Sequence, residues 1–223
     1  MTFSIVARCA ETGMFGVAVS SSSPAVAARC AHARAGIGAV ASQNVTDPSL
    51  GRRALDLMAL GAGAEQAVAV LKAGPHMAYR QVLAVDAQGA SAIHSGPSAL
   101  GTWAEASAEN VACGGNLLAD RNVPQAMVAA FTAARGHLGD RLLAAMRAAL
   151  AAGGEAGPVH SAGLMLVREV SWPVADLRVD WTEDCPIAAL ADLWAVYRPQ
   201  LDAYVTRALD PSSAPSYGVP GDL

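Results

Sequence analysis

The sequence predicts an α+β protein in which two antiparallel β-sheets pack face to face and helices lie outside each sheet. Short β-type runs alternate with helical segments along the chain, and tight turns join most successive strands. Such hairpin connections argue against a parallel Rossmann-type sheet, whose strands need longer crossovers. In addition, 53% of the 223 residues are hydrophobic, so the strands carry enough apolar surface to be buried on both faces.

The first strands form a predicted β-hairpin at the start of the chain. The β-type runs Thr2–Arg8 and Gly16–Ser20 are separated by the turn sequence Glu11-Thr12-Gly13. A short helix or a loop is expected over residues 25–33. Residues 36–43 then form a predicted buried strand, with glycines where another backbone could approach closely.

Helices are expected in the next segment. The sequence Asp47-Pro48-Ser49 is typical of a helix start, and this helix is predicted to continue to Gly61. A second helix over 64–73 ends at Gly74-Pro75, a strong stop signal. The remaining predicted elements are strands over 80–86, 90–95 and 109–113, helices over 124–134 and 138–151, strands over 161–168 and 174–179, and a terminal helix over 186–208.

A single domain is expected over residues 1–223. The length suits one substantial domain, and neither an internal repeat nor a convincing linker divides the chain. Residues from about 210 onward are rich in Pro, Ser and Gly, which predicts an irregular tail.

Composition and charge argue against several functional classes. The formal net charge is −4, and no basic stripe interleaved with aromatic residues indicates nucleic-acid binding. No apolar run reaches the ~20 residues that a membrane-spanning helix needs, and no secretory signal pattern opens the chain. We therefore expect a soluble, cytoplasmic protein with neither a nucleic-acid nor a membrane partner. The apolar excess and a charged strand near the C-terminus favour a homo-oligomer, such as a dimer.

Metal and cofactor binding are not expected. The cysteines form no C-x-x-C pair and have no histidines at the spacing of metal ligands. Without a secretory signal they are expected to stay reduced. The four predicted structural thiols are Cys9, Cys30, Cys113 and Cys185.

Thr2 is the leading candidate for a catalytic residue. Removal of Met1 would give this threonine a nucleophilic hydroxyl and a free α-amine on the same residue. The amine could act as the general base for the hydroxyl, because the reference pKa of an α-amino group is about 7.7–8.0. Threonine at position 2 is common, so this feature gains weight only from the strand pattern that follows it.

Several stretches, spread over nearly the whole chain, match a known family. They are residues 2–7, 16–21, 33–40, 115–117 and 176–180, together with Pro211 and residues 217–222. In these stretches the chain resembles the domain-of-unknown-function 1028 family, which is classed as similar to the N-terminal-nucleophile (Ntn) hydrolases. The resemblance implies a four-layer αββα sandwich and a candidate chemistry, but no particular reaction.

Two departures from the family pattern bear on the site. The chain has His160-Ser161 where Gln-Ser is expected, and Gly114 where Gln is expected before Gly115. Because both expected residues are polar, the departures are consistent with a changed substrate preference or an impaired site.

The resemblance implies three catalytic residues. In an Ntn-type site Thr2 would attack an amide carbonyl, and a nearby cation would keep its amine neutral. Arg34 lies where relatives would have a lysine and could supply that charge, and a surface salt bridge is the alternative. Asn116 follows two glycines and could donate to the oxyanion, and the alternative is an ordinary Gly-Gly-Asn turn.

Five further residues are candidate substrate contacts. Ser20 and Ser21 close the second strand, where they could orient the α-amine, contact substrate or simply form a turn. Gln43 and Asn44 end the third strand, where they could bind an oxyanion or a substrate amide, or satisfy loose backbone groups. Ser161 could reach the site from a later strand.

The sequence supports two functional hypotheses. The first is an amidohydrolase in which Thr2 cleaves a small linear or cyclic amide through an acyl-enzyme. The second is a non-catalytic protein on the same scaffold that binds a small carboxylate or amide near Arg34, Gln43 and Asn116. In both hypotheses the partner is a small molecule and no cofactor is required.

Overall fold

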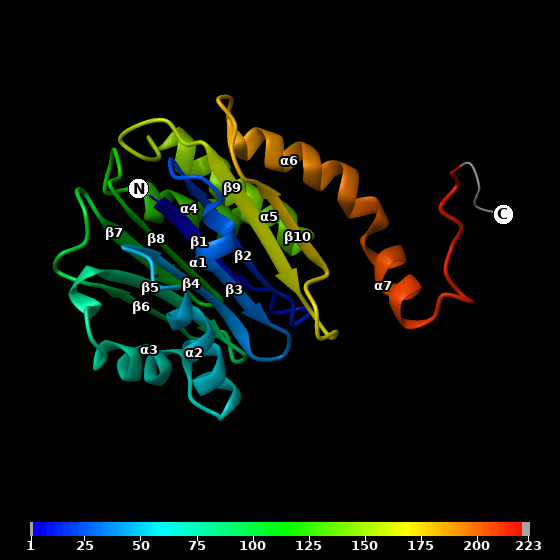
Figure 1. The fold of residues 1–223 in the computed structure, drawn as a ribbon, viewed down its shortest axis with the longest axis horizontal. Helices are drawn as coiled ribbons and strands as arrows, with labels where there is room; N and C mark the ends of the chain where they lie inside the picture. The colour runs from blue at the N-terminus through cyan, green and yellow to red at the C-terminus, as the bar shows by residue number, and fades with distance from the viewer. Residues whose placement is uncertain (1, 220–223) are drawn as a thin grey trace.

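Two antiparallel β-sheets lie face to face in the computed structural model, which describes residues 2–219 (Figure 1). The six-stranded sheet has the order β10-β9-β2-β1-β8-β7 and the four-stranded sheet the order β3-β4-β5-β6. Their strands are β1 (Thr2–Arg8), β2 (Phe15–Ser21), β3 (Ala31–Arg34), β4 (Gly38–Asn44), β5 (Arg80–Asp86), β6 (Ser91–Ser95), β7 (Ala104–Ala108), β8 (Val111–Asn116), β9 (Ser161–Val167) and β10 (Ala175–Val179). The predicted α+β fold with two antiparallel sheets is confirmed.

Helices cover both outer faces, which gives four layers. The four-stranded sheet carries α2 and α3, the six-stranded sheet carries α4 and α5, and α6 packs on β9 and β10 (Figure 1). The helices are α1 (Val26–Cys30), α2 (Pro48–Ala59), α3 (Ala64–Lys72), α4 (Val123–Ala133), α5 (Leu138–Ala151), α6 (Pro186–Tyr197) and α7 (Leu201–Leu209), with the 3-10 helices η1 (Met77–Tyr79) and η2 (Arg198–Gln200). Within residues 2–219, no helix is both long enough and apolar enough to cross a membrane.

Side-chain alternation along β1 determines what faces the space between the sheets. Phe3, Ile5 and Ala7 are fully buried on the side of α4 and α5, whereas Val6 belongs to the core between the two sheets. Because successive side chains of a strand point to opposite faces, Thr2 and Ser4 share the inner face with Val6. The start of β1 therefore directs polar side chains into the inter-sheet space.

Two parts of the chain differ from the sequence-based expectations. The sequence does not predict β7, an edge strand of small and polar residues with little β-propensity. The predicted terminal helix over 186–208 is interrupted at η2, because Pro199 cannot donate the backbone hydrogen bond that a continuous helix needs. Residues 210–219 form no helix or strand, as expected, and they lead away from the sandwich (Figure 1). Met1 and residues 220–223 lie outside the described residues.

Candidate functional site

Thr2 lies at the start of β1, between β2 and β8. Its backbone pairs with Asn116 of β8, and its hydroxyl donates to Ser21 Oγ of β2 at 3.4 Å. Thr2 is only 5% exposed. The Thr2 hydroxyl is therefore held at one end of the inter-sheet space, between two strand ends that carry polar side chains.

A chain of buried carboxamides links the two sheets at this end. Ser4 Oγ donates to Gln43 Oε1 at 2.7 Å. Gln43 Nε2 donates to Gln81 Oε1 at 2.7 Å and to the Gly114 carbonyl at 3.2 Å. Gln81 Nε2 donates in turn to Ser95 Oγ at 2.8 Å. Because the first three of these side chains are fully buried, the network provides the partners that water would otherwise supply.

Asn116 ends this network with an unsatisfied acceptor. Its Nδ2 donates to Gln81 Oε1 at 3.4 Å, whereas its Oδ1 is buried and has no hydrogen-bond partner within residues 2–219. Leaving a buried acceptor unpaired costs about 1–3 kcal/mol. This oxygen, on the strand next to Thr2, is therefore available to an N–H or O–H donor from a ligand.

Gly114, one of the two departures from the family pattern, makes room for Gln81. A Cβ at position 114 would lie 3.3 Å from both methyl carbons of Leu83 and 3.4 Å from Gln81 Nε2. Gln81 therefore occupies the space that a side chain at position 114 would enter.

Glu155 is a buried acid at the same end of the sandwich. It follows α5 in a glycine-rich loop, and both of its carboxylate oxygens accept from the Ser22 backbone N–H at 3.2 Å. The residue is 4% exposed. Burial raises the pKa of Glu155 to about 7, although the positive α-amino group of the chain and the hydrogen bond from Ser22 act in the opposite direction. Glu155 can therefore accept or release a proton near neutral pH.

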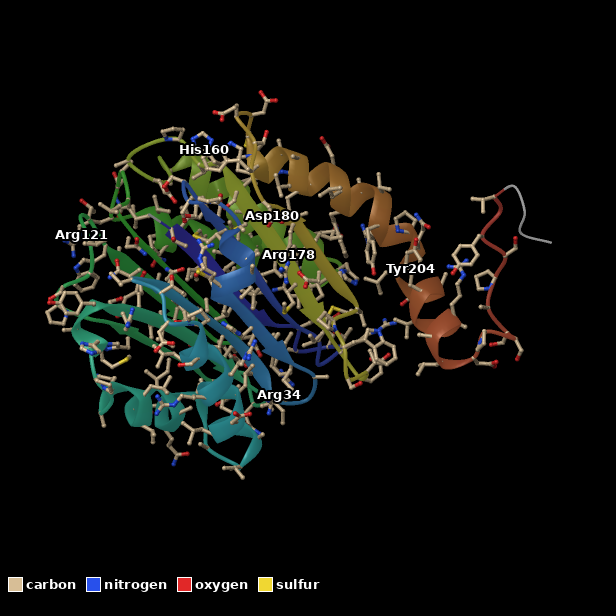
Figure 2. All side chains as sticks on the ribbon, in the orientation of Figure 1. Arg34, Arg121, His160, Arg178, Asp180 and Tyr204 are labelled. Atoms are coloured by element: carbon tan, nitrogen blue, oxygen red, sulfur yellow. The ribbon has the colours of Figure 1, made fainter. Side chains whose placement is uncertain are left out.

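Arg34 does not belong to this site. It pairs with Gly38 at the start of β4, whereas Gln43 lies near the other end of that strand. Its guanidinium forms an ion pair with Asp56 at 2.7 Å, and its side chain is 44% exposed. Arg34 and His160 lie at opposite ends of the strands (Figure 2). The expectation of a catalytic cation at this position is therefore corrected, and the alternative of a surface salt bridge holds.

A family model described as a family of unknown function, DUF1028, matches residues 2–190. The chain belongs to the DUF1028 family. The crystal structure of another DUF1028 protein, SPO2555 from Silicibacter pomeroyi, is similar with 31% sequence identity and a TM-score of 0.82, covering 88% of each chain. Anbu, the ancestral beta-subunit from Yersinia bercovieri, has 12% identity and a TM-score of 0.39, covering 91% of this chain and 97% of its own. No curated protein matches the sequence.

The three predicted serines of this DUF1028 protein have two different roles. Ser21 faces Thr2, and its Oγ lies 2.8 Å from Ser23 Oγ. Ser20 points to the opposite face of β2, where its hydroxyl donates to the Ser161 carbonyl at 2.9 Å. Ser161 Oγ donates to the Ser23 carbonyl at 2.6 Å and accepts from the first N–H of α1 at 3.3 Å. Ser20 and Ser161 therefore hold the strand and loop that follow Ser21, and they do not contact Thr2 through these bonds.

Asn44 satisfies backbone groups at the end of β4, which is the alternative that the sequence left open. Its φ is 75°, in the left-handed region that asparagine tolerates. Its side chain accepts from the Leu100 N–H at 3.1 Å and donates to the Tyr79 carbonyl. It points to the face of β4 opposite to Gln43, so the structure does not bring it to Thr2.

His160, the second departure from the DUF1028 pattern, lies beside the site. Its backbone N–H donates to the Ser21 carbonyl at 2.9 Å. Its imidazole stacks on Trp181 with the ring centroids 4.4 Å apart, and its Nδ1 lies 2.8 Å from the Thr182 carbonyl. The ring is therefore held by the segment before α6 and forms no Ser-His dyad with Ser161.

Metal ligands do not cluster in the part of the chain that the structure describes. Among residues 2–219, no group of three or more His, Cys, Asp or Glu side chains could hold a metal ion. The four cysteines are free thiols. Five surface cavities, of about 230–460 Å³, are lined by residues other than Thr2, Gln43 and Asn116.

Two residues at this end of the sandwich, Gln81 and Glu155, are not among the site residues predicted from the sequence. Gln81 has a usable signal, because it alternates with Leu83 and Val85 and so places a polar group on the buried face of a strand. Glu155 has none, because it lies in a loop between predicted elements. Of the predicted residues, the structure brings together Thr2, Ser21, Gln43 and Asn116.

Proposed function

We propose that this DUF1028 protein hydrolyses a small linear or cyclic amide, with Thr2 as the nucleophile once Met1 has been removed. The position of Thr2 carries the proposal. It opens an interior strand, and its hydroxyl lies at the polar end of the inter-sheet space, 3.4 Å from Ser21 Oγ. A nucleophile that also bears the first α-amine of the chain carries its own general base. The buried carboxamides nearby are groups of the kind that stabilise an oxyanion.

The proposed reaction has two steps. The Thr2 hydroxyl oxygen adds to the substrate carbonyl carbon, the α-amine takes the hydroxyl proton, and that proton passes to the leaving nitrogen as the C–N bond breaks. Water then hydrolyses the resulting ester and releases the acid. An α-amine with a pKa of about 7.7–8.0 can serve as base and then as acid near neutral pH. Asn116 is the proposed donor to the oxyanion, because both N–H groups of Gln43 are already used by Gln81 and Gly114, and Arg34 has no role.

The packing around β1 limits the direction from which a substrate could approach Thr2. Phe3 is fully buried on the helical side, and Val6 is fully buried between the sheets. A substrate must therefore enter at the end of the sandwich where β1 begins. Ser22 and Glu155, which are joined by hydrogen bonds there, line the proposed entrance.

The direct test compares a chain that begins at Thr2 with a chain that retains Met1. Intact-mass analysis identifies each form, and a panel of chromogenic linear amides and lactams measures hydrolysis. We expect activity only in the Met1-free chain, with a loss on the order of 10³-fold or more in Thr2→Ala. Thr2→Ser keeps the hydroxyl and should retain activity. Hydrolysis by the Met1-retaining chain would exclude the amine mechanism.

A second candidate function is non-catalytic binding of a small molecule at the same place. The unpaired Oδ1 of Asn116 favours it, because that buried acceptor would be satisfied by a ligand that donates an N–H. With Arg34 at the other end of β4, an amide suits this position better than a carboxylate. Retention of Met1 in protein from its own host, together with calorimetric binding of an amide, would support this candidate over hydrolysis.

We also propose that the protein forms a homo-oligomer. Exposed apolar side chains lie on or beside the C-terminal helices, among them Trp172 at 40%, Val196 at 68% and Leu209 at 63%. Light scattering of the purified protein tests this proposal, and the mass of a single chain would contradict it. A cytoplasmic location and a single domain over residues 1–223 stay predictions.

A further inference from the structure

The loop that carries Glu155 is attached to the strand on one side of Thr2. The backbone of Glu155 forms an antiparallel bridge with Leu118, two residues beyond the Asn116 that pairs with Thr2. Two flanking backbone hydrogen bonds, of 2.9 and 3.0 Å, fix the loop to the chain that follows β8. Glu155 therefore starts on the β8 side of β1.

The carboxylate of Glu155 reaches the strand on the other side. Both oxygens lie 3.2 Å from the backbone nitrogen of Ser22, the residue that follows β2. In the sheet, β1 lies between β2 and β8. A side chain that starts beside β8 and ends beside β2 spans the end of β1 at which Thr2 lies, and the α-amino group of the chain acts on its carboxylate.

Among residues 2–219, one backbone N–H serves both oxygens of this buried carboxylate. Glu155 is 4% exposed, and a carboxylate offers about four acceptor positions. A buried charge is costly unless a cation or further donors pair with it. The carboxylate of Glu155 is therefore well suited to receive an additional, positively charged donor.

We propose that Glu155 is the positioning residue for the α-amino group of Thr2, and that its carboxylate accepts a hydrogen bond from that group and holds it beside the Thr2 hydroxyl. The inference rests on the proposed function, because this group exists only after Met1 is removed. An ammonium group has three N–H donors. It can therefore serve Glu155 and also the unpaired Oδ1 of Asn116, which lies on the strand that pairs with Thr2.

The proton affinities of the two groups suit this pairing. Burial raises the pKa of Glu155 to about 7, close to the reference value of about 7.7–8.0 for an α-amine. A proton can therefore pass from the ammonium to the carboxylate, which leaves a neutral amine as the base and a neutral acid beside it. Two titratable groups act on Glu155, and both lower its pKa: the α-amino group of the chain and, more weakly, His160, whose Nδ1 lies 3.8 Å from Glu183 Oε2.

The test is an NMR titration of the Thr2 amine in the full chain that begins at Thr2, labelled with ¹⁵N-threonine. The unsubstituted chain is compared with Glu155→Gln, which keeps an acceptor for the Ser22 N–H but carries no charge. Loss of an opposite charge at contact distance should lower the amine pKa by about one unit. Glu183→Gln is the matched control, because its 80% exposed side chain lies at the same end, and it should leave the amine pKa unchanged.

The outcomes separate this inference from the proposed reaction. An unchanged amine pKa in Glu155→Gln would overturn the inference, whether or not the chain hydrolyses amides. A lowered amine pKa in a chain without hydrolase activity would support the role of Glu155 and exclude the proposed hydrolysis instead. In an active chain, the acid limb of the kcat/KM profile should move to lower pH by the same amount, which a purely structural role would not produce.

A second variant keeps the test decisive if thermal unfolding shows that Glu155→Gln does not fold. Glu155→Asp retains the charge but withdraws the carboxylate from the end of β1 by one methylene. We expect a smaller decrease of the amine pKa in this variant. No decrease at all would contradict the inference.

Discussion

The two ends of the inter-sheet space have opposite chemistry. At one end, strands of both sheets contribute apolar side chains, such as Phe15, Val17 and Val85, to a buried core. At the other end, the same layer is filled by side chains that are equally buried but polar, and these are Thr2, Ser4, Ser21, Gln43, Gln81 and Asn116. The change from apolar to polar occurs toward the same end of the sandwich on every strand that contributes.

This difference separates the part of the layer that stabilises the fold from the part in which we propose function. Apolar burial contributes roughly 25 cal/mol per Å², whereas a buried polar group needs a hydrogen bond merely to offset its desolvation. Asn116 Oδ1 has no such bond within residues 2–219. The polar end therefore lowers stability, as expected of a site that binds or reacts.

The largest effect on stability should come from the apolar end. Phe15 is 1% exposed in the core between the sheets, and Phe15→Ala should lower the free energy of unfolding by about 3–5 kcal/mol because it leaves a cavity. Chemical denaturation measures this loss. A loss below about 1 kcal/mol would show that the apolar end does not provide the stability that we assign to it.

Glu155 should make the polar end sensitive to pH. Its pKa rises from 4.5 to about 7 on folding, so between these values the folded state binds more protons than the unfolded state. Stability should therefore fall as the pH rises from 4.5 to 7, by on the order of 2–3 kcal/mol. In Glu155→Gln this contribution is absent, so the variant should be the more stable protein at pH 8 and similar at pH 4.

Urea denaturation at these two pH values, on chains with the same first residue, measures the comparison. If both chains lost stability in parallel between pH 4 and pH 8, the pH dependence would have to come from other groups. In that case Glu155 would not be the acid that titrates at this end of the sandwich.

Asn116→Ala should have only a small effect on stability. The substitution removes a 3.4 Å hydrogen bond to Gln81 but also removes the unpaired oxygen, so stability should change by no more than about 1 kcal/mol. Hydrolysis should nevertheless fall on the order of 10²-fold, because a donor to the oxyanion is lost. If Asn116→Ala and the unsubstituted chain had equal denaturation midpoints but unequal rates of hydrolysis, Asn116 would serve function and not stability.

Arg34→Gln is the matched control for that experiment. It breaks an exposed ion pair with Asp56 at the other end of β4, which is worth at most about 1 kcal/mol. Stability and hydrolysis should both remain near those of the unsubstituted chain. A loss of hydrolysis as large as that of Asn116→Ala would contradict the assignment of the two ends.

Much of the fold is encoded in local patterns. The period-two alternation and the turn residues predict strands over Thr2–Arg8 and 80–86, and the observed β1 and β5 have the same bounds. The interruption near Pro199 also has a local cause, since proline within a helical pattern is a known break. β7 has no such cause, because its pairing with β8 and not its own sequence makes it a strand.

The site was less predictable because it depends on contacts between the sheets. Gln43 and Asn116 could be found from their positions at strand ends, but their shared partner Gln81 pairs with Gln43 across a connection of two helices and faces Asn116 from the opposing sheet. Arg34 illustrates the reverse problem. Arg34 lies only a few residues before β4 in the chain, which suggests that it is near Gln43. The β3–β4 register instead pairs it with Gly38, at the end of β4 away from the site.

The central claim is that Thr2, with a free α-amine, forms an acyl-enzyme at the polar end of the inter-sheet space. Mass spectrometry of the Met1-free chain, quenched shortly after mixing with an amide that it hydrolyses and then mapped by peptide, tests this most directly. We predict an added acyl mass on the peptide that begins with Thr2, and none when Met1 is retained or in Thr2→Ala. An acyl group on another residue, or turnover by a chain with Met1 intact, would contradict the claim.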